Sequence, residues 1–255
     1  MITHSGPKAL TEYVLHQSKH KANKRSIILL VQGFLAGLYI SIGAIGSLKL
    51  SASITAPGMG NFLGALVFPL GIIAIILMQA ELFTSDCMVM TAVYAGRTKI
   101  SKIIRILCII IVSNLLGAIF AAFLTEASGI FDGAVTQFVI DKALHKVHMP
   151  IGQLLSSAIL CNIIVCTGVC LAYSCKEEIS KIIVLWLAIA VFVLSGTEHV
   201  VANMYYLFAA LFYGAELTVK DIFYNLAVSG MGNYIGGGLV VSGINYLLAY
   251  RDIEK

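Results

Sequence analysis

Two long apolar runs, residues 61–91 and 182–213, are each interrupted near the middle by polar side chains. In both interruptions a glutamate is followed five positions later by Asp or Asn, and the two glutamates, Glu81 and Glu198, lie 117 residues apart. An ionisable side chain costs roughly 2.5–3.5 kcal/mol at the centre of a bilayer, so such residues rarely occur there without a role. The interruptions therefore predict functional polar groups at bilayer depth.

The flanking segments repeat with nearly the same spacing. The Asn-x-x-Gly sequences at 114–117 and 233–236 lie 119 residues apart. A repeat of about half the chain that carries polar groups at bilayer depth is typical of transport proteins with two related halves. We therefore expect a transport pore built from two homologous halves.

The composition is that of an integral membrane protein. Of the 255 residues, 59% are hydrophobic and 12% are charged, and the mean hydropathy is +0.92. A helix needs about 20 apolar residues to cross a bilayer. Six segments meet this length, three in each half: about 26–48, 61–91, 102–125, 150–175, 182–213 and 224–249. The second and fifth are too long for a simple crossing, which predicts a broken helix in each.

The distribution of Lys and Arg predicts the orientation, because cytoplasmic segments carry more of them. Thirteen of the 17 lie in the N-terminal segment, in the loops 92–105 and 176–181, or in the C-terminal tail. The remaining four are Lys49, Lys142, Lys146 and Lys220. We therefore expect a multi-pass protein of the plasma or inner membrane with both termini in the cytoplasm.

Three regions follow from this reading: a cytoplasmic N-terminal segment (1–25), a six-helix membrane channel domain (26–250) and a cytoplasmic tail (251–255). Four residues at helical spacing after Pro7 predict a short amphipathic helix in the first region: Leu10, Tyr13, Val14 and Gln17.

Several other functions are not indicated. The basic residues form no clustered face interleaved with aromatic residues, so no nucleic-acid partner is expected. The six cysteines lie in or beside predicted spans, without His or carboxylate at ligand spacing, so we expect no metal and no other cofactor. The chain lacks His-Glu-x-x-His and Gly-x-Ser-x-Gly, so we do not expect an enzyme, and an intramembrane hydrolase is a weaker alternative.

Four motifs follow one another at suitable depth in the predicted spans. They are Ala80-Glu81-Leu82-Phe83-Thr84-Ser85, Leu160-Cys161-Asn162 through Val165 and Cys166, Ser195-Gly196-Thr197-Glu198-His199-Val200-Val201-Ala202-Asn203-Met204, and Gly232-Asn233-Tyr234-Ile235-Gly236-Gly237-Gly238. Together they resemble the formate/nitrite transporter family, over about residues 26–250.

This resemblance implies an all-α homopentamer of aquaporin-like protomers, with an inverted three-plus-three repeat and one pore per protomer for small weak-acid anions. The break in the second span would be a loop that closes the cytoplasmic side, and the break in the fifth would face the pore centre. Two residues depart from the family pattern: Gln79 stands where Gly is usual, and Asp86 where Asn is common. A carboxylate would repel an anion, so Asp86 is either neutralised, turned away or involved in selectivity.

His199 is the one of six histidines that lies deep in a predicted span. A bare anion loses its hydration in an apolar pore, whereas a weak acid that takes up a proton can cross as a neutral molecule. In water, proton transfer from imidazolium to a carboxylate costs roughly 4 kcal/mol, and a dry site narrows this gap because burial penalises both charged forms. His199 is thus a candidate proton donor; the alternative is a structural histidine bonded to Glu198 or to the backbone.

Four further residues are candidates for the pore. Thr84 could hold the anion or orient His199, or it could cap the half-helix that follows. Asn162 and Asn203 offer amide donors at depth, and Asn203 could instead tie the broken backbone together. The resemblance places a lysine of the pore mouth at Lys146, where a cation raises the local anion concentration; the alternative is a solvated loop charge.

Apolar constrictions are expected at Leu82, Phe68 and Phe192, on their positions relative to the motifs and the family pattern. Glu81 and Glu198 are expected to be structural, accepting hydrogen bonds from backbone N–H groups exposed at the two breaks.

The sequence therefore predicts a passive or proton-coupled channel for small monovalent weak-acid anions. Formate is the first choice, with nitrite or hydrosulfide as alternatives within the same family. A pore for neutral solutes such as glycerol is a weaker alternative, because it would not need His199 or Lys146. The expected partners are the anion, protons, the lipid bilayer and other copies of the chain.

Overall fold

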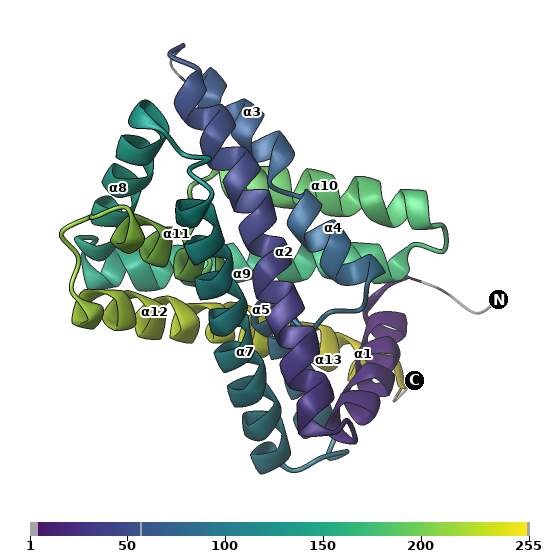
Figure 1. The fold of residues 1–255 in the computed structure, drawn as a ribbon. Coiled ribbons are helices and arrows are strands. Elements are labelled where there is room, and N and C mark those ends of the chain that lie inside the picture. Colours follow the sequence, from purple (N-terminus) through teal and green to yellow (C-terminus); the bar gives the residue numbers. More distant parts are fainter. Residues whose placement is uncertain (1–4, 57, 254–255) are drawn as a thin grey trace.

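The computed structural model describes residues 5–56 and 58–253, and every regular element in this part of the chain is helical (Figure 1). The first four residues of the predicted N-terminal segment and the last two of the predicted tail lie outside the described residues. The prediction of an all-helical fold is confirmed.

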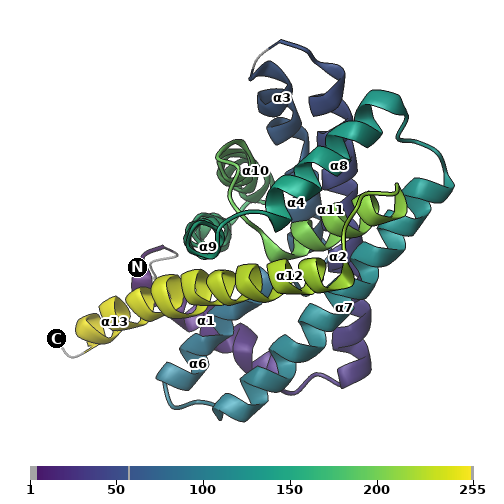
Figure 2. The same ribbon diagram turned by 90° about the vertical axis from the view of Figure 1, so that its left-hand side faces the viewer.

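Three long helices are unbroken: α2 (Ser26–Ser53), α7 (Ile100–Ala127) and α9 (Ile151–Ser174). The second predicted span is divided into α3 (Met59–Val67), α4 (Leu70–Leu77), α5 (Phe83–Asp86), the 3₁₀ turn η1 (Cys87–Met90) and α6 (Thr91–Tyr94). The fifth is divided into α10 (Glu178–Leu194) and α11 (Val200–Phe212). The sixth is α12 (Val219–Tyr234), the π-helical η2 (Ile235–Val241) and α13 (Ser242–Ile253), which follow one another as a single rod (Figure 2).

Two helices lie outside the predicted spans. α1 (Pro7–Ala22) forms where the sequence predicts a short N-terminal helix, and α8 (Gly133–Val147) occupies the segment expected to be the loop around Lys146. The loop prediction is therefore corrected: Lys146 lies in the last turn of a helix.

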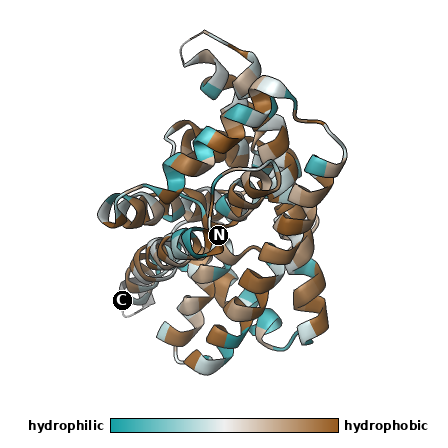
Figure 3. Cartoon of the chain, turned by 60° about the vertical axis from the view of Figure 1, so that its left-hand side comes forward, coloured by the Kyte–Doolittle hydropathy of each residue, from teal (hydrophilic) through white to brown (hydrophobic). Residues whose placement is uncertain are grey.

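Four helical segments in the described residues are long and apolar enough to cross a membrane: Ser26–Ser53, Met59–Leu77, Ile100–Ala127 and Ile151–Ser174. The remaining two predicted spans consist of shorter pieces, so the count of six stays a prediction. Hydrophobic residues dominate the helices in Figure 3, and large apolar side chains such as Leu187, Met231 and Leu247 are about 60% exposed, as expected for surfaces that face lipid or another protomer.

The two halves of the chain are arranged alike. α2 packs along α7 in the first half, and α9 packs along α12 in the second. Close approach depends on a glycine in each pair: a Cβ at Gly117 of α7 would lie 2.1 Å from the carbonyl oxygen of Phe34, and one at Gly232 of α12 would lie 2.8 Å from that of Leu155. In Figure 1 the first-half helices α2 and α7 run steeply across α9 and α12.

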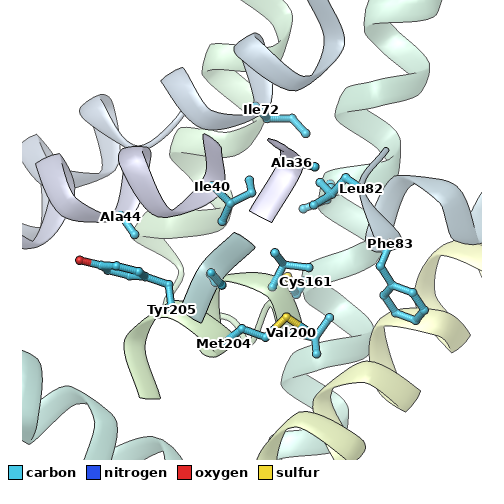
Figure 4. Close-up of a cluster of buried hydrophobic side chains, with 14 of the residues drawn as sticks. Ala36, Ile40, Ala44, Ile72, Leu82, Phe83, Cys161, Val200, Met204 and Tyr205 are labelled. Carbon is cyan, nitrogen blue, oxygen red and sulfur yellow. The ribbon is translucent and has the colours of Figure 1, made fainter. Parts of the chain in front are cut away.

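The two breaks converge on the centre of the protomer. Figure 4 shows Leu82 and Phe83 from the first break near Val200 from the second, with Ile40 of α2 and Cys161 of α9 around them. Leu82, Val200 and Cys161 are completely buried. The core therefore fixes the break segments against both halves, and the polar groups of the breaks are held inside it.

Candidate functional site

The first break is held by one asparagine. The Asn114 side chain accepts a hydrogen bond from the backbone N–H of Phe83 (2.9 Å) and donates to the carbonyl oxygens of Gly33 (2.8 Å) and Glu81 (2.9 Å). A break in a membrane helix exposes backbone groups that water cannot reach, so they need such partners. Asn114 thus provides hydrogen-bond partners for two backbone groups of the break and links the break to α2.

Asn233 makes the equivalent three bonds at the second break. Its side chain accepts from the N–H of Val200 (2.8 Å) and donates to the carbonyl oxygens of Ala158 (2.7 Å) and Glu198 (2.9 Å). The internal repeat seen in the sequence is therefore a repeat of contacts as well.

This arrangement corrects the expected bonding of Glu81 and Glu198. In the described part of the chain, Asn114 and Asn233 each accept from one backbone N–H at a break, and the two carboxylates accept hydrogen bonds from lysine or asparagine side chains. An amide can accept from one backbone group and donate to two others, whereas a carboxylate can only accept. Asn is therefore the better residue to close a break that has both kinds of group.

His199 and Thr84 meet between the two breaks. His199 Nε2 lies 2.9 Å from Thr84 Oγ1, and both residues are buried. The other ring nitrogen, Nδ1, accepts a hydrogen bond from the backbone N–H of Ala202 (3.2 Å), since His199 is the N-cap of α11. This bond assigns the proton of the neutral ring to Nε2, which donates to Thr84 Oγ1. The Thr84 hydroxyl proton is then available for a further acceptor. The hydrogen bond between Thr84 and His199 is not a helix cap.

The predicted constriction residues lie beside this pair. The ring of Phe192 is centred 5.5 Å from the His199 ring, and Phe68 packs edge-on against Phe192 with centroids 5.8 Å apart. Leu82 precedes Thr84 by two residues in the first break, and its side chain is fully buried. Apolar groups therefore surround the imidazole–hydroxyl pair.

Two cavities lie near the breaks, one at the pair and one at the first break. The α8 cavity, about 340 Å³ in volume, reaches His199 and is lined by Lys142, Lys146, Phe192 and Asn203 among others. The α1 cavity, about 710 Å³ in volume, lies between the N-terminal helix and the first break and is lined by Tyr13, His20, Lys21, Lys24, Ala80 and Glu81 among others. The α1 cavity thus reaches Glu81, the residue before Leu82, and the α8 cavity reaches His199.

Lys146 is part of a buried polar network. Its ammonium donates to Glu198 Oε1 (2.7 Å), and Asn203 donates to Glu198 Oε2 (2.7 Å) and to Asn225 Oδ1 (2.9 Å). Lys146 is only 6% exposed, which is not the state of a solvated loop charge. Its charge is compensated by Glu198, and the donors of Asn203 are already used within the protein.

The side-chain amide of Asn162 also donates to backbone carbonyl oxygens. Its Nδ2 donates to the carbonyl oxygens of Thr84 (3.0 Å) and Asn233 (2.5 Å). The side chain therefore holds Thr84 in place and links the first break to α12. These two hydrogen bonds explain why Asn162 is buried at this depth, and they do not require contact with a substrate.

Asp86 is paired with a lysine, which supports neutralisation among the alternatives that the sequence left open. The Lys21 ammonium of α1 donates to Asp86 and lies 2.6 Å from Glu81 Oε2, and Lys24 donates to Glu81 Oε1 (2.7 Å) and to Gln32 Oε1 (3.0 Å). Burial on its own would lower the pKa of Lys21, but Asp86 and Glu81 together outweigh it and raise that pKa far above its ordinary value. Sequence reasoning missed both lysines; the basic last turn of the predicted N-terminal helix was the available signal.

The second departure from the family pattern, Gln79, has a strained backbone. Its φ is +53°, which makes it the one non-glycine residue with positive φ in the described chain. An L-residue in this region carries a cost of about 1–2 kcal/mol that glycine does not. The strained residue lies where the chain turns from α4 into the break. Its carbonyl oxygen accepts a hydrogen bond from the Gln32 side chain (2.7 Å), which helps to hold this conformation.

Removing Lys21 should destabilise the protein through Asp86. In Lys21→Met the carboxylate of Asp86 loses its counter-charge while it stays buried, and leaving one such charge unpaired costs about 3–5 kcal/mol. The double variant Lys21→Met/Asp86→Asn should recover most of this, because no orphan charge remains. Thermal unfolding of the purified variants measures both, with Lys19→Met, on the exposed side of α1, as the matched control. Equal melting of the single and double variants would contradict the ion-pair account.

The fold and the site together define a multi-pass membrane channel for small solutes: two broken helices meet at a buried imidazole–hydroxyl pair, with one cavity at His199 and another at the first break. The family model described as formate/nitrite transporter matches residues 8–247. The chain belongs to the formate/nitrite transporter family, as the sequence motifs predicted.

Similar proteins of known sequence extend over nearly the whole chain. It is 32% identical to an uncharacterized transporter, YrhG, of Bacillus subtilis (strain 168), over 98% of this chain and 95% of that protein. It is 32% identical to the formate channel BtFdhC of Bacillus thuringiensis (96% and 95%) and 30% identical to the formate channel FocA of Haemophilus influenzae (92% and 91%).

Two solved structures share the fold. An FNT family ion channel superposes with a TM-score of 0.87 at 26% identity, over 94% of this chain and 98% of that one. A pentameric formate channel with formate bound superposes with a TM-score of 0.82 at 28% identity, over 89% and 98%. The predicted fold class is confirmed by these likenesses.

Proposed function

We propose that this protein is a homopentameric channel of the plasma or inner membrane that passes formate, with nitrite or hydrosulfide as alternative anions. The family membership and the two relatives named as formate channels support this substrate class. The observation that carries the proposal is the buried His199–Thr84 pair at the meeting point of the breaks, with the α8 cavity reaching its imidazole.

The pair provides a route for a proton. In the resting state the ring is neutral, because Nδ1 accepts the Ala202 N–H and the start of α11 disfavours positive charge. When a proton from the vestibule displaces that bond and protonates Nδ1, the Thr84 hydroxyl gives its proton to the anion and takes the Nε2 proton of the imidazolium. The products are a neutral acid, an intact Thr84 hydroxyl and a neutral ring that now carries its proton on Nδ1. The ring returns to its resting tautomer when Nε2 takes up a proton and Nδ1 releases one. The neutral acid then crosses the apolar surroundings at a far lower cost than the anion.

The orientation follows from the positive residues, with six spans and both termini in the cytoplasm. The α1 cavity is then the cytoplasmic vestibule and the α8 cavity the extracytoplasmic one. Leu82 separates the first from the pair, and Phe68 and Phe192 narrow the passage beside it. Lys146, paired with Glu198, has its main role in holding the outer part of the pore together.

Uptake into proteoliposomes tests the proposal. Labelled formate, nitrite, hydrosulfide and glycerol are offered separately to vesicles with the purified protein and to empty vesicles. We expect protein-dependent flux of formate that rises with an inward proton gradient, and no protein-dependent flux of glycerol. Equal flux of glycerol and formate would instead support the neutral-solute pore, and chemical conversion of a substrate without flux would support an enzyme.

A further inference from the structure

The α8 cavity contains a second lysine that the site described so far does not use. Lys142 lies one turn before Lys146 on α8, and both line this cavity together with His199. Its ammonium lies 5.1 Å from the centre of the Tyr206 ring and 5.9 Å from that of Phe138. These contacts hold the cation over aromatic faces without using its N–H donors.

The two lysines and two carboxylates that line the cavity sum to zero formal charge, but they differ in how closely they are paired. Lys146 is paired with Glu198, so this pair contributes little net charge. Asp141, the other carboxylate of the lining, is exposed and accepts a hydrogen bond from Gln137 (2.8 Å). Among the described residues no carboxylate forms an ion pair with Lys142. Lys142 is therefore the lysine of the lining whose charge no carboxylate contacts at ion-pair distance.

From this geometry we infer that Lys142, and not the ion-paired Lys146, forms the anion-binding subsite of the α8 cavity, where a small carboxylate is received before it reaches His199. The inference rests on the proposed function and specifies one step of it. A cation in a concave, weakly polar site concentrates anions and speeds their association by about 10- to 1000-fold, with a strong dependence on ionic strength.

Lys142 is also placed to lose its charge at moderately alkaline pH. Burial, with Lys146 beside it, lowers the pKa of Lys142 to about 8, against the opposing attraction of Glu198. The groups around it are Asp141, His145 and Lys146 on α8 and, from the second break and α11, Glu198, His199 and Tyr206. A lowered lysine pKa means that the charged form predominates below pH 8 and is lost above it. Reception of the anion should therefore weaken as the pH rises through 8.

The test is exchange of labelled formate at equal pH on both sides of proteoliposomes, so that no proton gradient contributes. At pH 7, low ionic strength and subsaturating formate, Lys142→Gln should lower the exchange rate about tenfold, and the loss should shrink to within about twofold in 0.5 M salt. Lys220→Gln, which removes an exposed charge outside the cavity, is the matched control and should leave the rate unchanged.

Lys142→Arg provides the second arm, because arginine keeps its charge at all accessible pH values. The ratio of its exchange rate to that of the wild type should be near one at pH 7 and rise severalfold between pH 8 and 10. A flat ratio would overturn the inference, as would a salt-independent or absent effect of Lys142→Gln in a folded protein. If Lys142→Gln does not fold, the Arg ratio decides. Absence of formate exchange by the wild type would instead refute the proposed function, so the two failures are distinguishable.

Discussion

Asn233→Ala should abolish the folded channel. The substitution removes three hydrogen bonds at once, leaving the N–H of Val200 and the carbonyl oxygens of Ala158 and Glu198 without the Asn233 side chain. An unsatisfied buried backbone group costs about 1–3 kcal/mol, so the total is on the order of 6 kcal/mol, comparable to the whole stability of many proteins. The break would also lose its tie to α9, and with it the position of His199.

Yield and thermal stability in detergent, measured by size-exclusion chromatography after heating, check this prediction. Asn245→Ala is the matched control: this α13 residue donates one hydrogen bond, to the Val241 carbonyl oxygen at 2.9 Å, and its loss should lower stability by no more than about 1 kcal/mol. Asn114→Ala should behave like Asn233→Ala, because it removes the same three kinds of bond. A stable Asn233→Ala protein with wild-type transport would show that the asparagine does not hold the break.

The repeat in the sequence was sufficient to locate these asparagines, but their role was not visible. Asn114 and Asn233 stood out by spacing alone, whereas their partners lie 31 to 81 residues away in the chain. Local rules about helix ends assigned backbone N–H groups at the breaks to Glu81 and Glu198. That assignment was wrong because a local rule considers neighbours in sequence, and the breaks are closed by helices from elsewhere in the same half.

Prediction from the sequence was limited in the same way for the charged groups. The departure at Asp86 was recognised from the sequence, but its compensation by Lys21 depends on how α1 docks under the first break. Lys146 was identified as a cation of the pore mouth, yet its burial and its bond to Glu198 follow from the unexpected helix α8. Patterns of hydrophobicity fix where a chain enters the membrane, whereas the pairing of charges depends on contacts between distant segments.

His199→Asn should reduce formate uptake driven by a proton gradient by roughly 100-fold, within the range that a positioned proton donor contributes to a reaction. Asparagine keeps an amide N–H that can donate to Thr84 Oγ1, so the local polarity and the hydrogen bond are preserved while the capacity to carry a proton is lost. The remaining flux should no longer rise as the external pH falls. His148→Asn, at the exposed end of α8 and outside both cavities, is the matched control and should retain both rate and pH response.

Variants of Thr84 distinguish a proton relay through its hydroxyl from an effect of the nearby His199 ring alone. Thr84→Ser retains the hydroxyl between His199 and the anion and should keep most of the flux, whereas Thr84→Val preserves the shape without a transferable proton and should approach the rate of His199→Asn. If uptake by His199→Asn were as strongly stimulated by acid as in the wild type, protonation would occur outside the pair, and the pair would serve only to orient the anion. The relay therefore predicts that His199→Asn and Thr84→Val both lose flux. The reason is that the proton passes from the ring to the anion only through the hydroxyl that lies 2.9 Å from Nε2.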